Sequence, residues 1–389
     1  MISGPSRDPA TTGPLARGGR VAALRGAVVA LTPRASAHAG SSRDPASALL
    51  DAIVEDVRAK HRLPGLAALV YSSEGVVEVG AAGVRRSGGS EPLAAGDLLH
   101  IGSLTKAITV TMLATLVAEG RLEWESRLLD VVPMPRDEAH EGHGCATIAD
   151  LVDHRAGIQA WTDGRTIPCF QGNGGTCVEG TPGEQRLAAT RWLLARRPLF
   201  PRGRFRYSNG GYVILAAIAE HLTGKPWESL IRERLLRPLV IEPAFGWPLD
   251  TGPGQPSGHQ RRRGRYLPVA PDAYRLPACL APAGDLSLTL DGYARFGRLH
   301  LRAARDQSTS ILDPASLRQL HPTDDKQHAG WQAGRKGRLR YLGGEGSAGT
   351  FYAISLLVPE RDRGVIVIAN AGGNVARKAT LAVALRIFD

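Results

Sequence analysis

The chain has 389 residues, 43% of them hydrophobic, which is enough apolar material for one large domain or for two lobes with a real core. Its apolar runs fall short of the ~18–20 residues that a membrane-spanning helix needs, so we expect no membrane span. The net charge of +11 invites a nucleic-acid partner, but the basic residues are scattered, and their densest cluster, residues 259–266, lies in a Gly/Pro-rich stretch with few aromatics. We interpret that cluster as a solvated loop and expect no nucleic-acid partner.

Residues 1–45 are rich in Gly, Ala, Pro, Ser and Arg, the composition of a disordered leader. Within them, the apolar segment GAVVAL followed by ASAHAG is typical of a signal peptide with a small-residue cleavage site. The short apolar run and the long polar stretch before it argue against that interpretation. We therefore expect a folded domain over residues 46–389 behind this leader, in a secreted or periplasmic protein or, if the leader is not a signal peptide, a cytoplasmic one.

From about residue 46 the sequence predicts regular elements. Apolar residues at helical spacing predict a first helix, and residues 65–84 predict two strands joined by a tight Ser-Glu-Gly turn. The other end of the chain predicts strands over 351–358 and 364–369 and then a helix near 374–387. We therefore expect an α/β fold of the α+β type, with an antiparallel sheet built from both chain ends and flanked by helices.

The middle of the chain, about 115–280, predicts helices separated by long Gly/Pro loops. This pattern indicates a mainly helical second lobe beside an α/β lobe formed by about 46–115 and 280–389. A cleft between two such lobes is the natural place for a ligand.

Cys169 and Cys177 enclose a short glycine-rich loop that a disulfide would close in an oxidising compartment, and two unpaired thiols are the alternative. His140, His143 and Cys145 are close enough in sequence to be metal ligands. Because no second ligand pair follows them and the stretch is polar loop, we expect no metal site.

Residues 100–122, HIGSLTKAITVTMLATLVAEGRL, predict a helix with one buried face that ends at Gly120. Ser103 is at its start and Lys106 is three residues further on, about 60° around the helix, so the two side chains are neighbours. A serine in this position is usually only a helix cap. A serine hydroxyl can also become a nucleophile when a base takes its proton, and a buried lysine can be that base. Only six of the 48 basic residues are lysines and no other Ser-x-x-Lys occurs, which favours the catalytic interpretation.

A second segment, FPRGRFRYSNGGYVILAAIAEHLTGKPW, places Tyr207 and Asn209 immediately before a helix with an apolar face. The structural interpretation makes Asn209 an N-cap and Tyr207 a half-buried aromatic. The functional interpretation makes Tyr207 a proton shuttle, and Asn209 a hydrogen-bond donor to substrate and lysine.

The segment GGEGSAGTF, residues 343–351, contains a G-x-G-x-x-G, which is typical of the phosphate-binding turn of dinucleotide-binding enzymes. That turn must open a helix. The residues that follow here are β-branched, aromatic and apolar, and they predict a strand. We therefore exclude dinucleotide binding, and these glycines need another explanation.

The order and separation of these segments resemble the serine β-lactamase and penicillin-binding-protein family, particularly its class C β-lactamases, D-peptidases and family VIII esterases. IGSLTK resembles the nucleophile motif of the family and YSN its Tyr-x-Asn motif, and the similarity extends from about residue 48 to 385. The resemblance implies a β-lactamase/transpeptidase-like fold. It also implies that Ser103 is the acylated nucleophile, that Lys106 and Tyr207 are the proton-transfer pair, and that Asn209 is a positioning group.

The same resemblance accounts for the glycines. The third motif of the family, Lys-Thr-Gly or His-x-Gly, corresponds to GEGS, so Gly344 stands where a cationic residue is expected. The resemblance implies that Gly346 lets the substrate lie against the strand, and that the backbone N–H groups of Ser103 and Ser347 form an oxyanion hole. Glu345 either lies near the substrate or points to solvent. Because the missing cation helps to bind the carboxylate of β-lactams and peptides, a neutral ester or amide substrate is favoured.

We therefore expect a serine acyl hydrolase that forms an acyl-enzyme with an ester or amide, in the manner of an esterase or a D-peptidase. Its partner would be a small molecule or short peptide, its chemistry would need no metal or organic cofactor, and its oligomeric state is open. A β-lactamase or an acyltransferase could use the same site. The alternative from another class is a penicillin-binding or ligand-binding sensor module that is acylated once and does not turn over.

Overall fold

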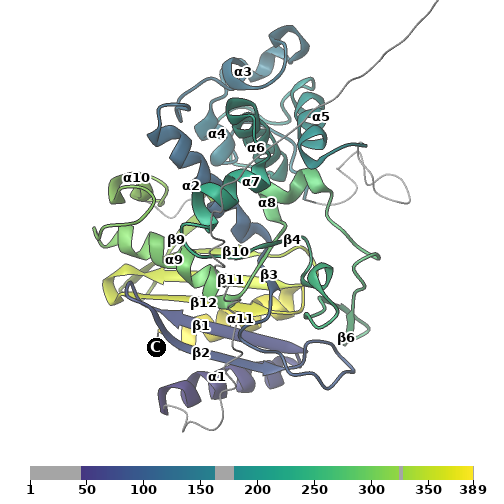
Figure 1. The fold of residues 1–389 in the computed structure, drawn as a ribbon, viewed down its shortest axis with the longest axis vertical. Coiled ribbons are helices and arrows are strands. Elements are labelled where there is room, and N and C mark those ends of the chain that lie inside the picture. Colours follow the sequence, from purple (N-terminus) through teal and green to yellow (C-terminus); the bar gives the residue numbers. More distant parts are fainter. Residues whose placement is uncertain (1–44, 163–178, 324–326, 389) are drawn as a thin grey trace, which may run out of the picture. The chain divides into compact units, whose positions relative to one another are not determined.

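The computed structural model describes residues 45–162, 179–323 and 327–388 (Figure 1). The predicted leader lies outside these residues, and so do Cys169 and Cys177 with the disulfide proposed between them. No helix in the three described ranges is long and apolar enough to cross a membrane.

A seven-stranded antiparallel sheet forms the core of the α/β part, in the order β2-β1-β12-β11-β10-β9-β8. Its strands are β1 (Gly65–Tyr71), β2 (Val76–Gly83), β8 (Gln327–His328), β9 (Trp331–Lys336), β10 (Leu339–Gly346), β11 (Tyr352–Val358) and β12 (Arg363–Ala369). The N-terminal strand β1 pairs with the C-terminal strand β12, from Leu66 opposite Ala369 to Tyr71 opposite Gly364. The prediction of an antiparallel sheet built from both chain ends is therefore confirmed.

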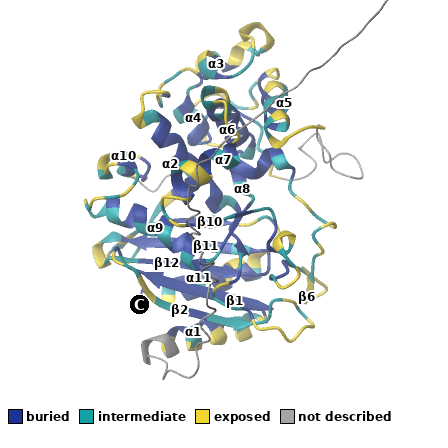
Figure 2. Ribbon diagram, in the orientation of Figure 1, coloured by how far each residue is buried: buried dark blue, intermediate teal, exposed yellow. Residues whose placement is uncertain are grey.

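Helices cover both faces of this sheet (Figure 1). α1 (Pro45–His61) and α11 (Asn374–Arg386) pack on one face, and α9 (Leu290–Ala304) packs on the other. Successive side chains of a strand point to opposite faces, so β1 sends Leu66 and Ala68 into the core beneath α1 and α11, and Ala67 and Leu69 into the core beneath α9. Burial on both faces explains why the central strands are apolar throughout (Figure 2).

The middle of the chain is mainly helical, as predicted. Its helices are α2 (Thr105–Ala118), α3 (Leu128–Val131), α4 (Ile148–Val152), α5 (Pro182–Leu194), α6 (Asn209–Thr223), α7 (Trp227–Ile231) and α8 (Ala281–Gly284), and α10 (Pro314–Arg318) follows later in the chain. Short turns of 3-10 helix lie at Gly102–Leu104, Arg136–Glu138, Glu141–His143, Pro248–Thr251, Ala278–Leu280 and Pro359–Arg361, and a π-helical turn extends α7 over Arg232–Leu236.

α2 differs from the prediction of a helix with one buried face. Every residue from Thr105 to Leu116 is buried, because α6, α7, α8 and α10 pack around the helix. The large apolar residues do form one face of α2, as predicted, but the other faces, which consist mainly of Thr and Ala, are buried as well.

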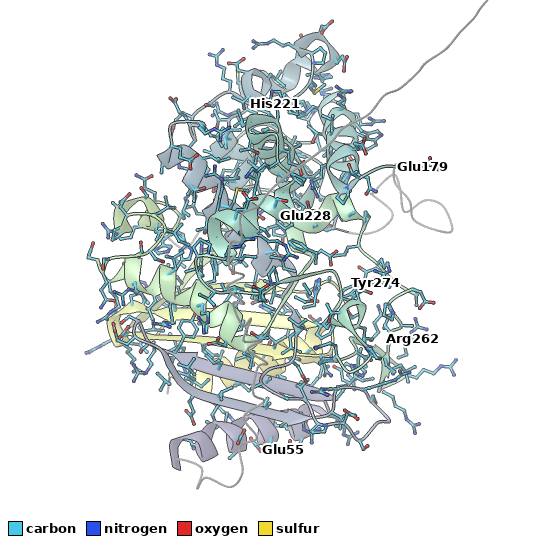
Figure 3. All side chains as sticks on the ribbon, viewed as in Figure 1. Glu55, Glu179, His221, Glu228, Arg262 and Tyr274 are labelled. Carbon is cyan, nitrogen blue, oxygen red and sulfur yellow. The ribbon has the colours of Figure 1, made fainter. Side chains whose placement is uncertain are left out.

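Two small sheets complete the fold. One has the order β3-β7-β4 and consists of β3 (Leu99–His100), β4 (Ala244–Phe245) and β7 (Leu286–Leu288). The other is a hairpin of β5 (His259–Arg262) and β6 (Arg265–Pro268). The prediction of a loop at residues 259–266 was therefore wrong. His259 anchors this hairpin, because its backbone N–H donates to Thr350 O and its ring contacts Asn370 O. Arg262, at the other end of β5, is exposed (Figure 3).

Candidate active site

Ser103 lies where β3 turns into the helix α2. Gly102 adopts φ +53 and so makes the sharp turn that a residue with a side chain would resist. The hydroxyl of Thr105 donates to Gly102 O at 2.7 Å and closes the first helical turn. Ser103 is therefore presented, partly exposed, at a helix N-terminus, where backbone N–H groups have no partner within the helix.

Lys106 is 1% exposed, and its amine contacts three oxygen atoms. Nζ donates to Ala283 O at 2.6 Å and to Asn209 Oδ1 at 2.7 Å, and it lies 3.3 Å from Ser103 Oγ. Burial lowers the pKa of Lys106 well below its ordinary value. In its neutral form the amine has two N–H groups and one lone pair, so the two short contacts would use both donors and leave the lone pair to accept from the hydroxyl of Ser103. This arrangement suits a base.

Tyr207 contacts the same hydroxyl, since its O–H donates to Ser103 Oγ at 2.7 Å. Burial raises the pKa of Tyr207 to about 12, although the hydrogen bond to Ser103 opposes the shift, so the phenol keeps its proton at neutral pH. The ring of Tyr207 packs on that of His154 at 4.6 Å, and Lys106 Nζ lies 4.7 Å from its centroid. Burial also lowers the pKa of His154, to about 3, so this neighbouring ring is neutral.

Asn209 is the first residue of α6, and the helix is capped by the preceding Ser208, whose hydroxyl accepts from Gly211 N. The carboxamide of Asn209 has both ends in use. Its Oδ1 accepts from Lys106, and its Nδ2 donates to Trp161 O at 2.8 Å. The prediction made Asn209 the donor to the lysine. In the structure Lys106 donates and Asn209 accepts, so the direction of this hydrogen bond is the reverse of the prediction. Asn209 orients Lys106.

β10 approaches the Ser103 turn so closely that only glycine fits. A Cβ on Gly346 would lie 1.9 Å from Ile101 O and 2.9 Å from Ser103 N. A Cβ on Gly102 would lie 2.3 Å from the backbone N of Ser347. The amides of Ser103 and Ser347 therefore flank the same small region, and the hydroxyl of Ser347 donates elsewhere, to Phe351 O at 2.6 Å.

Glu345 is on the opposite face of β10 from the two glycines that flank it. Its carboxylate accepts from Arg377 of α11 at 2.7 and 2.8 Å and from the hydroxyl of Tyr352. The arginine and the tyrosine together lower the pKa of Glu345, although burial acts against them. The structure therefore gives no support to the predicted contact of Glu345 with substrate.

Gly344 faces Leu104, the residue immediately before α2, and the space beside it is filled. A Cβ there would lie 2.9 Å from Leu104 Cδ2 and 3.4 Å from Gly330 O. The position where the resemblance expects a Lys or His is thus occupied by the side chain of Leu104. The two positions of β10 that face the Ser103 turn are therefore both glycines, Gly344 and Gly346, and neither supplies a charged side chain.

Three groups at the site were not identified from the sequence. Two are the backbone carbonyls of Ala283 and Trp161, which hold Lys106 and Asn209. No residue type marks a carbonyl, so the sequence contains no signal for them. The third is His154, which could have been noticed as a histidine within the segment TIADLVDHRAGI.

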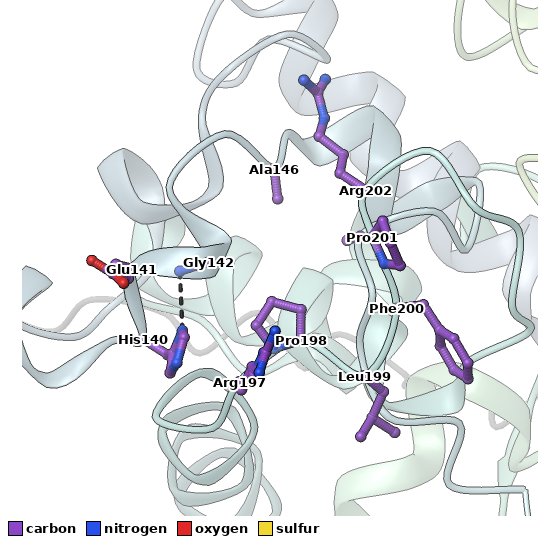
Figure 4. Close-up of a pocket in the computed structure, with 11 residues that line it drawn as sticks. His140, Glu141, Gly142, Ala146, Arg197, Pro198, Leu199, Phe200, Pro201 and Arg202 are labelled. Atoms are coloured by element: carbon purple, nitrogen blue, oxygen red, sulfur yellow. Dashed lines mark hydrogen bonds between the residues drawn. The ribbon is translucent and has the colours of Figure 1, made fainter.

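The two histidines considered as metal ligands have other partners, whereas Cys145 is a free, exposed thiol. His140 Nδ1 accepts from Gly142 N at 3.0 Å, and buried His143 contacts Arg196 O through Nε2, also at 3.0 Å. A hollow of about 760 Å³ lies beside them, lined by His140, Glu141 and Gly142 and, opposite, by residues 197–202 (Figure 4). Over the described residues, no group of three or more His, Cys, Asp or Glu side chains is arranged to hold a metal ion.

Comparison with known proteins places this geometry in context. The family described as Beta-lactamase matches residues 50–387. "Penicillin-binding protein 4" of Amycolatopsis lactamdurans is 27% identical over 265 residues, which are 67% of this chain and 65% of that protein. The chain thus spans slightly less than two thirds of that relative. A "Putative D-alanyl-D-alanine carboxypeptidase" of Escherichia coli (strain K12) is 28% identical over 163 residues, 40% of this chain and 36% of that protein.

Solved structures share the fold. The structure titled "Crystal structure of SurE" covers 88% of this chain and 75% of its own, with a TM-score of 0.70 and 25% identity. The octameric penicillin-binding protein homologue from Pyrococcus abyssi covers 88% of this chain and 77% of its own, with a TM-score of 0.71 and 22% identity. The D-amino acid amidase from Ochrobactrum anthropi SV3, complexed with L-phenylalanine amide, covers 87% of this chain and 98% of its own, with a TM-score of 0.67 and 19% identity.

Proposed function

The chain belongs to the β-lactamase family, and from this premise we propose that it is a serine hydrolase that cleaves an ester or amide through an acyl-enzyme on Ser103. One observation carries the proposal: the hydroxyl of Ser103 lies between two proton-transfer groups, 2.7 Å from the phenol of Tyr207 and 3.3 Å from the amine of Lys106. A cap serine has no need of a buried lysine and a buried tyrosine on the same oxygen.

In the first step, neutral Lys106 takes the proton of the Ser103 hydroxyl while Oγ bonds to the substrate carbonyl carbon. The carbonyl oxygen becomes an oxyanion. The N–H groups of Ser103 and Ser347 flank the region where this charge develops, and donors fixed in advance stabilise it without rearrangement. Burial supports the role of Lys106, because it lowers the pKa of the amine well below its ordinary value and so favours the neutral form.

In the second step, the carbon–heteroatom bond of the leaving group breaks and Tyr207 donates its proton to the departing oxygen or nitrogen. The raised pKa of Tyr207 supports this assignment, since a phenol that holds its proton at neutral pH is an acid. The proton that Lys106 took from Ser103 then restores the phenol. Deacylation uses the same groups in reverse, with water replacing the alcohol or amine.

The substrate is proposed to be a D-amino-acid amide or ester without a free carboxylate at the scissile end. Two of the compared proteins are named as a D-alanyl-D-alanine carboxypeptidase and a D-amino acid amidase. A carboxypeptidase substrate presents a carboxylate next to the scissile bond, and a cation normally binds it. Because Leu104 fills the place of such a cation at Gly344, the amide or ester is the better match of the two.

The test is a comparison of unaltered protein with Ser103→Ala on a panel of D-alanine amide, D- and L-alanine p-nitroanilide, p-nitrophenyl butyrate, a D-Ala-D-Ala peptide and a penicillin. We expect steady turnover of the amides and esters, abolished in Ser103→Ala, and an added acyl mass on Ser103 by intact-protein mass spectrometry. One stoichiometric burst without turnover would identify a sensor module instead. Absence of both mass shift and turnover for every compound would refute the proposal.

A further inference from the structure

His100, the last residue of β3, has no role in the catalytic steps proposed above, although it contacts the turn before Ser103. Its ring is fully buried, 4.4 Å from the ring of Trp247 and 6.2 Å from that of Phe351. Nδ1 accepts from the backbone N–H of Gly102 at 3.2 Å, and Nε2 lies 3.0 Å from Asp285 Oδ1. The imidazole therefore links a carboxylate to the turn that presents the nucleophile.

These contacts determine the tautomer of His100. A backbone N–H can only donate, so Nδ1 must carry a lone pair, and the ring proton must be on Nε2, where it donates to Asp285. The carboxylate thus keeps the ring in the one neutral form that can accept from Gly102. Without it, the proton could move to Nδ1, and two donors would then face each other.

Asp285 belongs to a segment that also contacts Lys106, the proposed base. Two residues earlier, Ala283 O accepts from Lys106, and between them Gly284 lies beside the turn before Ser103, where a Cβ would make ordinary van der Waals contact with Gly102 C at 3.5 Å. The backbone of Asp285 is itself fixed, since its carbonyl accepts from Gly246 N at 3.0 Å. One short segment consequently contacts both the amine of the proposed base and, through His100, the turn before Ser103.

We propose that His100 and Asp285 form a positioning pair for acylation: through the N–H of Gly102 they hold the turn that aims the N–H and hydroxyl of Ser103. This inference rests on the proposed function for its catalytic consequence. The contact fixes Gly102 at φ +53, immediately before the amide assigned to the oxyanion. If the Ile101–Gly102 peptide plane lost its contact with His100, φ of Gly102 could change and the next peptide plane, which carries the Ser103 N–H, would tilt away from the developing charge. A misplacement of ~1 Å in such a site can cost about 100-fold in rate.

Two substitutions of His100 separate this role from packing. His100→Asn can place a carboxamide oxygen near the position of Nδ1 and keep the acceptor for Gly102. His100→Gln reaches toward Asp285 and loses that acceptor. We expect the acylation rate constant in single-turnover ester cleavage to fall about 100-fold in His100→Gln and less than about 10-fold in His100→Asn, with an unchanged half-saturating substrate concentration. The acylation rate constant of Asp285→Ala should lie between those of His100→Gln and His100→Asn.

His259 provides a matched control, because it is also fully buried and its Nε2 accepts a backbone N–H, from Ser87 at 2.9 Å, but it lies in the β5–β6 hairpin rather than in the β3-β7-β4 sheet. His259→Gln should lower the melting temperature and leave the acylation rate within about twofold. If His100→Gln and His259→Gln lose melting temperature alike and both keep the rate of acylation, the positioning role is overturned.

Hydrogen exchange tests the contact without any substrate. Mass spectrometry of a peptide spanning residues 99–104 should show faster exchange in His100→Gln than in His100→Asn, because only the former leaves the Gly102 amide without an acceptor. Equal exchange in the two variants and the unaltered protein would overturn the inference. Failure of the unaltered protein to acylate would refute the proposed function instead, since the exchange comparison does not depend on turnover.

Discussion

Removal of the Tyr207 hydroxyl is the sharpest test of the proton route. In Tyr207→Phe the ring should keep its place, because the contact with His154 at 4.6 Å and the amine of Lys106 at 4.7 Å involve the ring and not the oxygen. The variant loses one hydrogen bond, to Ser103 Oγ, which is worth about 1 kcal/mol net in folding stability. A general acid contributes 10²–10⁴-fold to rate, which is about 3–5 kcal/mol of activation free energy.

The leaving group decides which of these effects is measured. p-Nitrophenolate departs without a proton, so Tyr207→Phe should lose little in kcat/KM on a p-nitrophenyl ester and about 10²–10⁴-fold on D-alanine amide or an alkyl ester. Tyr212→Phe is the control, because Tyr212 also faces Lys106, at 5.3 Å, but its hydroxyl contacts Val152 O. Equal losses on both substrate classes would place Tyr207 at the nucleophile and refute its role as the acid.

Three further outcomes can be measured on the same assays. The proposed mechanism needs neutral Lys106, whose pKa burial lowers, so kcat/KM should persist above that lowered pKa and fall as the pH drops through it. Because the unfolded chain binds this proton up to the ordinary pKa of 10.5, folding stability should rise with pH between the lowered pKa and 10.5. Lys106→Met should remove this rise in a series of thermal melts and, because it removes the proposed base, should also abolish turnover. Gly346→Ala places a methyl group against backbone and should cost about 1–3 kcal/mol of unfolding free energy and most of the activity, which denaturant titration and ester turnover would reveal. Glu345→Gln should change kcat/KM less than twofold, since the carboxylate points away from Ser103. A larger change would indicate that Glu345 acts on the substrate after all.

Much of the fold was predictable because it depends on local patterns. Alternation and apolar runs located the strands at both chain ends, and helical spacing located α2, since burial imposes those periods on the sequence. The proximity of Ser103 and Lys106 was also predictable, because three residues on one helix are neighbours wherever that helix lies. The hairpin at residues 259–268 was missed because distant backbone contacts of His259 decide it.

The amino-acid sequence by itself determined which chemical groups this protein has and which of them share a helix. Only the tertiary structure decided their state, because burial comes from segments far apart in the chain. Desolvation by α6 and α8 lowers the pKa of Lys106. The carbonyl of Ala283 orients that amine, and because it is a backbone group, no residue type in the sequence indicates it. The close approach of β10 likewise explains the bare backbone at Gly346: glycine stands there because any Cβ would collide with the turn that carries Ser103.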